Sequence, residues 1–117
     1  MMSGDGGFFL NMTELWTAAQ ERPDIVMVVM NDRGYGVIKH IQDSLYGGRR
    51  FYGDLLTPDL QQLAALAGVP SFKVTEGNTF GATVAQAMAV SGPTLVEVDM
   101  TAIGAFPPYA PYNKKQA

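Results

Sequence analysis

Six consecutive apolar residues, IVMVVM at positions 25–30, constrain the fold more than any other feature of this chain. The run is rich in β-branched side chains and lacks the alternation of a half-exposed strand. It therefore predicts a strand buried on both faces, as in a parallel sheet. The polar residues at 31–34 then form the turn at its carboxyl end. The run is also far too short to cross a bilayer.

Helical patterns alternate with strand patterns along the rest of the chain. Asn11 and Glu14 have the spacing of a capping box, and Thr57, Pro58 and Asp59 form a second helix start. We expect helices over 11–22, 35–46, 58–67 and 79–90, and strands over 25–30, 71–75 and 93–99. Strands that alternate with helices indicate βαβ units, so the chain is predicted to be an α/β domain with a parallel sheet.

Two acidic turns are predicted to lie at one edge of this sheet, one in Gly4-Asp5-Gly6 and the other at Asn31-Asp32. Ligands of open α/β sheets bind where strands end at their carboxyl termini. A strand should precede Gly4, yet only three residues do, so the chain is expected to be truncated at the N-terminus of its fold. Taken alone, Gly-Asp-Gly is typical of a simple Asx turn.

Composition narrows the possible functions. The formal net charge of −3 and the absence of a Lys/Arg run argue against a nucleic-acid surface. The chain has no cysteine, which excludes disulfides, thiolate metal sites and a cysteine nucleophile. No secretory signal or membrane span is recognisable, so we expect no membrane association and a cytoplasmic location.

The spacing of the two acidic turns points to a family. Between Gly6 and Asn31 lie 24 residues, and Gly34-Tyr35-Gly36 follows. This pattern resembles the GDG…NN motif of thiamine diphosphate enzymes. The blocks GDGGFFLNMTELWTAAQ, NDRGYGVIKHIQD, TPDLQQLAALAG and GPTLVEVDM are similar to those of the acetolactate synthase-like branch.

The resemblance implies a three-layer doubly wound parallel sheet, the thiamine diphosphate-binding fold. Residues 1–117 would form the C-terminal part of its diphosphate-binding domain, with 101–117 as an irregular tail. The implied cofactors are thiamine diphosphate and Mg²⁺. The implied metal ligands are the side chains of Asp5 and Asp32 and the backbone of Gly34, which supply the oxygen atoms that Mg²⁺ prefers. The further cofactor-binding residues would be Gly4, Gly6, Gly7, Tyr35 and Gly36; backbone at glycine can approach phosphate closely.

The same resemblance implies that Val37, Ile38 and Ile41 lie beside the thiazolium and the substrate; ordinary core packing is the alternative. Relatives that decarboxylate pyruvate or indolepyruvate typically carry Glu where Ile38 stands, so an apolar residue there suits carboligation better. His40 is either catalytic or, as its polar neighbours favour, exposed to solvent. In the tail, Tyr109 and Tyr112 would either close over the cofactor or lie on the surface.

The implied function is the thiamine diphosphate- and Mg²⁺-binding portion of an acetolactate synthase-like enzyme acting on 2-oxo acids. In this family a separate pyrimidine-binding domain activates the cofactor. It is missing here, so the chain alone is not expected to turn over substrate, and no catalytic residue is assigned. Two alternatives stay open: a separate subunit of a split decarboxylase, or a non-catalytic truncated module that self-associates. A homo-oligomer is expected.

Overall fold

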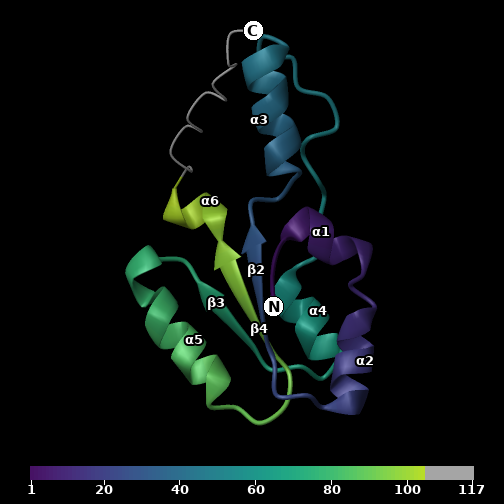
Figure 1. The fold of residues 1–117 in the computed structure, drawn as a ribbon, viewed down its shortest axis with the longest axis vertical. Helices are drawn as coiled ribbons and strands as arrows, with labels where there is room; N and C mark the ends of the chain where they lie inside the picture. The colour runs from purple at the N-terminus through teal and green to yellow at the C-terminus, as the bar shows by residue number, and fades with distance from the viewer. Residues whose placement is uncertain (105–117) are drawn as a thin grey trace, which may run out of the picture.

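The computed structural model describes residues 1–104, and a four-stranded parallel sheet forms its centre (Figure 1). The strand order is β1-β2-β4-β3, and each neighbouring pair runs parallel. The strands are β1 (Met2–Gly4), β2 (Val26–Asn31), β3 (Ser71–Val74) and β4 (Thr94–Asp99). The predicted α/β class is therefore confirmed.

Helices cover both faces of the sheet, which makes the domain three-layered as predicted. The helices α1, α2 and α4 lie on one side and α5 on the other (Figure 1). The helices are α1 (Asp5–Leu10), α2 (Glu14–Glu21), α3 (Gly36–Leu45), α4 (Leu60–Leu66), α5 (Phe80–Met88) and α6 (Met100–Ile103), with a 3₁₀ turn at Gly77–Thr79.

Each face of the sheet has its own hydrophobic core, because alternate residues of a strand point to opposite sides. On β2, Met27 and Val29 pack toward α1, α2 and α4, whereas Val28 packs toward α5. Every residue of the central strand β4 is buried. The first core contains Phe8, Leu15, Met27, Val29, Leu60, Leu63, Ala64, Ala67, Val69 and Leu95; the second contains Val28, Val74, Ala87, Val96 and Val98.

Helix α3 stands apart from these layers. It extends beyond the carboxyl ends of the strands, and none of its residues is buried (Figure 1). The connection to α4 runs back along it: the side-chain amide of Gln42 makes two hydrogen bonds with the backbone of Phe51, at 2.9 and 3.2 Å. The chain thus leaves the sheet after β2 and returns to the sheet edge before α4.

The N-terminal segment differs from the sequence-based expectation. The strand that was expected to be missing before Gly4 is present, although short: residues 2–4 pair in parallel register with Val28, Val29 and Met30. The single helix expected from Asn11 is two helices. Asn11 ends α1, with its N–H bonded to the carbonyl of Phe8, and makes no capping box with Glu14.

Two further boundaries were predicted wrongly. Asp59, not Thr57, caps α4; its Oδ1 accepts a hydrogen bond from the N–H of Gln62 at 2.9 Å. The expected irregular tail begins instead with the helical turn α6, because Asp99 caps it through the N–H of Thr101. Tyr109 and Tyr112 lie outside the described residues.

Candidate functional site

Strand pairing brings the two acidic turns together. Gly4 of β1 is in register with Met30 of β2, so the residues that follow each strand emerge at the same edge of the sheet. The Oδ2 atom of Asp5 accepts a hydrogen bond from the N–H of Gly34 at 3.0 Å, and its Oδ1 accepts one from Gly6 at 2.9 Å. Two of the three predicted metal ligands, Asp5 and Gly34, are therefore joined by a hydrogen bond.

The electrostatics of Asp5 are unusual, since its side chain is buried and only 1% of the residue is exposed. Burial raises the pKa of the Asp5 carboxyl, and the neighbouring Asp32 raises it further by its negative charge and by a hydrogen bond. The backbone N–H groups of Gly6 and Gly34 act in the opposite direction, but the pKa remains raised. Two neighbouring carboxylates repel one another unless a proton or a cation lies between them.

Close approaches explain three of the glycines at this site. A Cβ on Gly36 would collide with Oδ2 of Asp32, and one on Gly34 would collide with the carbonyl oxygen of Gly53. A Cβ on Gly6 would lie 2.7 Å from the ring of Tyr35. These glycines let the turn, the start of α3 and the start of α1 pack against one another.

The two remaining glycines of the predicted set are less constrained. A Cβ on Gly4 would meet nothing within 4 Å, and one on Gly7 would lie 3.1 Å from the Oγ of Ser3. The backbone at Gly4 is therefore open on that side, as the prediction of a close approach to phosphate requires.

A segment from the α3–α4 connection secures the turn. The N–H of Tyr35 donates to the carbonyl of Gly53 at 2.8 Å, and the N–H of Leu55 donates to the carbonyl of Arg33 at 3.1 Å. Lys39 of α3 adds an ion pair with Asp54 at 3.2 Å. The backbone that carries Gly34 is thus held between Asp5 on one side and residues 53–55 on the other.

The three apolar residues predicted to line the substrate pocket are not core. Val37, Ile38 and Ile41 on α3 are 69%, 44% and 38% exposed. Apolar side chains on one helical face are normally covered in the working protein, and residues 1–104 leave this face of α3 partly exposed. His40, on the same helix, is exposed.

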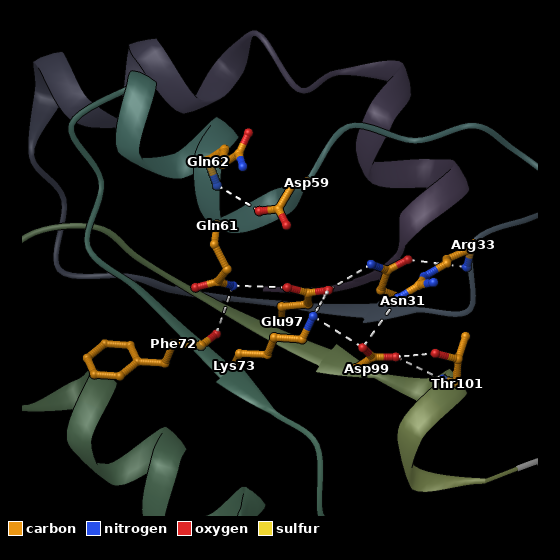
Figure 2. A network of polar contacts seen from close by, with 10 residues as sticks. All are labelled: Asn31, Arg33, Asp59, Gln61, Gln62, Phe72, Lys73, Glu97, Asp99 and Thr101. Atoms are coloured by element: carbon orange, nitrogen blue, oxygen red, sulfur yellow. Dashed lines mark hydrogen bonds and ion pairs between the residues drawn. The ribbon is translucent and has the colours of Figure 1, made fainter.

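Sequence reasoning missed a buried polar network next to the site (Figure 2). Two acids, Glu97 and Asp99, lie two residues apart on β4. They therefore point to the same face of the sheet as Leu95, which lies two residues before Glu97. Oε1 of Glu97 accepts a hydrogen bond from Asn31 at 2.8 Å, and Oε2 accepts one from Gln61 at 3.0 Å. The signal was present in GPTLVEVDM, where acids occupy alternate positions of a strand otherwise rich in apolar residues.

Basic side chains balance these acids (Figure 2). Lys73 lies 3.4 Å from Glu97 and 3.2 Å from Asp99, and Arg33 lies 3.6 Å from Asp99. A hydrogen bond from the Thr101 hydroxyl lowers the pKa of Asp99 against the effect of burial, and Lys73 lowers it further. Burial acts to lower the pKa of Lys73. The hydrogen bonds to Asp99 and Glu97 and the negative charges of these two acids outweigh burial, and the pKa of Lys73 is raised.

The described residues contain no group of three or more His, Cys, Asp or Glu side chains placed to hold a metal ion. A metal at the predicted site would therefore depend on two carboxylates and a backbone carbonyl, with the remaining oxygens coming from elsewhere. None of the helices within residues 1–104 has the length and hydrophobicity needed to cross a membrane.

The sheet is open and parallel, and its acidic and glycine-rich turns lie together at the carboxyl ends of the strands. This is the architecture of a cofactor-binding α/β domain. Residues 1–98 match the family described as "Thiamine pyrophosphate enzyme, C-terminal TPP binding domain". The chain belongs to this family, whose cofactor is thiamine diphosphate (thiamine pyrophosphate, TPP). The resemblance seen in the sequence is confirmed.

Individual relatives agree with this assignment. An acetolactate synthase large subunit of Porphyra purpurea is 32% identical over 102 residues, which is 86% of this chain and 17% of the relative. A mitochondrial acetolactate synthase catalytic subunit of Saccharomyces cerevisiae is 26% identical over 99 residues, covering 85% of this chain and 14% of the relative.

A solved structure gives the same result for the fold. The thiamine diphosphate-dependent 4-hydroxybenzoylformate decarboxylase of Rhodococcus jostii RHA1 superimposes with a TM-score of 0.76 at 30% identity. The match covers 85% of this chain and 19% of that protein. The chain thus spans less than a fifth of each relative's length, and corresponds to an acetolactate synthase-like C-terminal TPP-binding domain.

Proposed function

We propose that this chain binds the diphosphate of thiamine diphosphate through Mg²⁺, held by Asp5, Asp32 and the carbonyl of Gly34. It would serve as the diphosphate-binding part of an acetolactate synthase-like enzyme that decarboxylates or joins 2-oxo acids. Family membership supports the cofactor. The metal ligands, the reaction and the substrate class are the proposal.

One observation supports the metal site above others: the buried carboxyl of Asp5 accepts a hydrogen bond from the N–H of Gly34, and the negative charge of the neighbouring Asp32 raises its pKa. A divalent cation between the two carboxylates would relieve their repulsion and would use the hard oxygen donors that Mg²⁺ selects. The donor set therefore fits Mg²⁺ chemically. The open backbone at Gly4 supports close approach by a phosphate.

Thiamine diphosphate, when bound, supplies the electron sink that decarboxylation or carboligation of a 2-oxo acid requires. The chain's own residues would bind and orient it. Asp5 and Asp32 would anchor the diphosphate end through the metal, and Gly6 would give Tyr35 room beside the turn. The apolar side chains at the start of α3 would exclude water from the reacting end.

The exposed face of α3 supports the need for a further domain. Val37, Ile38 and Ile41 form an apolar surface that residues 1–104 leave partly exposed. We propose that a pyrimidine-binding domain covers it, either in the same polypeptide or in a second one. Activity would then require that domain, and the split-decarboxylase alternative corresponds to the second arrangement. We also retain the cytoplasm as the predicted location.

A calorimetric titration tests the cofactor proposal. Thiamine diphosphate is added to the 117-residue chain with Mg²⁺ or with EDTA, and the measurement is repeated with Asp5→Ala. The matched control is Asp43→Ala, which removes an exposed α3 carboxylate paired with Arg50. We expect Mg²⁺-dependent binding that Asp5→Ala abolishes and Asp43→Ala leaves unchanged. Equal binding by the Asp5→Ala chain would rule out the proposed ligand set.

A second candidate is the non-catalytic module that self-associates. The three-residue strand β1 lies at the edge of the sheet, where backbone groups are available for pairing with another chain. Light scattering over a concentration series measures this directly. Self-association without cofactor binding would favour the module, whereas a monomer at all concentrations would contradict the predicted homo-oligomer.

A further inference from the structure

We infer that Glu97 is a positioning residue for the cofactor site: through Asn31, it orients the turn that carries Asp32 and Gly34. This inference rests on the proposed function for its biological meaning. Glu97 lies in the middle of the sheet, on β4, and none of the predicted site residues is its neighbour in sequence. Its influence passes through hydrogen bonds and the backbone of the turn; Figure 2 shows the bonds that join Glu97, Asn31 and Arg33.

The series has three links. Oε1 of Glu97 accepts a hydrogen bond from Nδ2 of Asn31 at 2.8 Å, across 66 positions of sequence. Oδ1 of Asn31 in turn accepts from the N–H of Arg33 at 3.2 Å, which shapes the turn after β2. The next N–H, that of Gly34, donates to Asp5 at 3.0 Å. The Glu97 carboxylate thus orients the Asn31 amide, and that amide orients the turn.

The chemistry of position 97 supports orientation over simple stability. Glu97 is 3% exposed, and a buried carboxylate is costly unless it is paired and hydrogen-bonded. A buried ion pair is seldom more stable than apolar packing of the same volume, and Leu95 packs on the same face two residues earlier. A charged group here has a different advantage, because a carboxylate with fixed partners accepts from Asn31 in one orientation only.

The partners of Glu97 provide that fixed geometry. Gln61 of α4 donates to Oε2 at 3.0 Å and to the carbonyl of Phe72 at 3.3 Å, and Lys73 of β3 lies 3.4 Å from Oε1. The carboxylate is therefore held from α4 and from β3, while its bond to Asn31 faces β2. Elements from three parts of the chain thus determine the position of one amide.

Three variants separate positioning from packing. Glu97→Leu removes the acceptor for Asn31, whereas Glu97→Gln keeps one. Gln61→Leu is the matched control, because it deletes a hydrogen bond to the other oxygen of the same carboxylate and leaves the Asn31 bond in place. If Glu97 has a purely structural role, Glu97→Leu and Gln61→Leu should have similar effects on the turn and on cofactor binding. If Glu97 positions the turn, Glu97→Leu should have the larger effect on both.

Two measurements are made on the full 117-residue chain. The first is amide hydrogen exchange at Arg33 and Gly34 without cofactor: Glu97→Leu should accelerate it about tenfold or more, by opening the turn locally. The second is the dissociation constant for thiamine diphosphate with Mg²⁺. It should rise by about 10- to 100-fold, as is usual when a group that orients a metal ligand is lost. Glu97→Gln should stay close to the native values in both, and Gln61→Leu should change each of them much less than Glu97→Leu does, because Lys73 still holds the carboxylate and the bond to Asn31 remains.

The outcomes are distinct. Unchanged exchange at Gly34 in Glu97→Leu, or equal acceleration in Gln61→Leu, would overturn the inference. If the native chain binds no cofactor, the proposed function fails, and hydrogen exchange still decides whether Glu97 orients the turn. If Glu97→Leu does not fold, Asn31→Ala takes its place, since it breaks the same link while Glu97 keeps Lys73 and Gln61. Unaltered exchange in Asn31→Ala would then refute the series.

Discussion

The substitution Gly36→Ala should separate binding from stability. Gly36 is the first residue of α3, and a Cβ added there would collide with Oδ2 of Asp32. The obstacle is the end of a side chain and not backbone, so the collision is relieved when Asp32 rotates. We expect that rotation to move the carboxylate away from Asp5 and so to remove one of the two proposed side-chain ligands of the metal.

The expected change in stability is close to zero, because two effects of similar size oppose each other. Ala stabilises a helix relative to Gly by up to about 1 kcal/mol. An Asp side chain displaced from its preferred rotamer costs about 0.5–1.5 kcal/mol. The affinity for thiamine diphosphate with Mg²⁺ should nevertheless fall by about 10- to 100-fold, the loss typical of a disturbed ligand shell.

The control is Gly81→Ala, near the start of α5, where an added Cβ would meet nothing within 4 Å. It should raise the free energy of unfolding by up to about 1 kcal/mol and leave the affinity unchanged. Denaturant unfolding and calorimetry measure the two quantities. If Gly36→Ala gains stability like the control and binds cofactor normally, Asp32 is not placed as described.

The remaining predictions concern the scaffold. Leu15 lies on the buried face of α2, and Leu15→Ala should lower the free energy of unfolding by about 2–5 kcal/mol. Leu10 is exposed, and Leu10→Ala should change the free energy of unfolding by less than about 0.5 kcal/mol. Asp59→Ala should cost about 1 kcal/mol by removing the α4 cap, and Thr57→Ala almost nothing; equal costs would contradict the observed cap. The lowered pKa of Asp99 means that its ionised form stabilises the fold at pH values above the unfolded pKa of about 3.9, and this contribution is lost as the pH falls through the lower pKa of the folded state. Asp99→Asn should therefore flatten the loss of stability that acid-unfolding curves show below about pH 4.

The sequence was sufficient for features that depend on near neighbours along the chain. The apolar run before Asn31 predicted β2, and Gly68, with φ +72°, ends α4 as expected. Helix starts were less predictable, because several polar residues compete for each one. Thr57 and Asp59 are both good caps, and only the path of the chain back from α3 decides that Asp59 has the required backbone geometry.

The candidate site likewise has features that the sequence predicts and features that depend on the tertiary structure. Two acidic turns could be placed at one edge of the sheet from their spacing, since strands in a parallel sheet end on the same side. Their direct contact depends on β1 lying beside β2 in a particular register, and the sequence alone does not determine that register. The role of Glu97 was invisible for the same reason, because its partner Asn31 lies 66 positions away.

By itself, the sequence determined a parallel α/β domain with two acidic, glycine-flanked turns, because hydrophobic periodicity and turn chemistry are properties of short segments. Only the tertiary structure decided that Asp5 bonds to Gly34 beside Asp32, that Tyr35 fills the space beside Gly6, and that a buried carboxylate on β4 supports the turn. These contacts join residues far apart in the chain. They form only when strand order and register bring those residues together, and no local pattern records either.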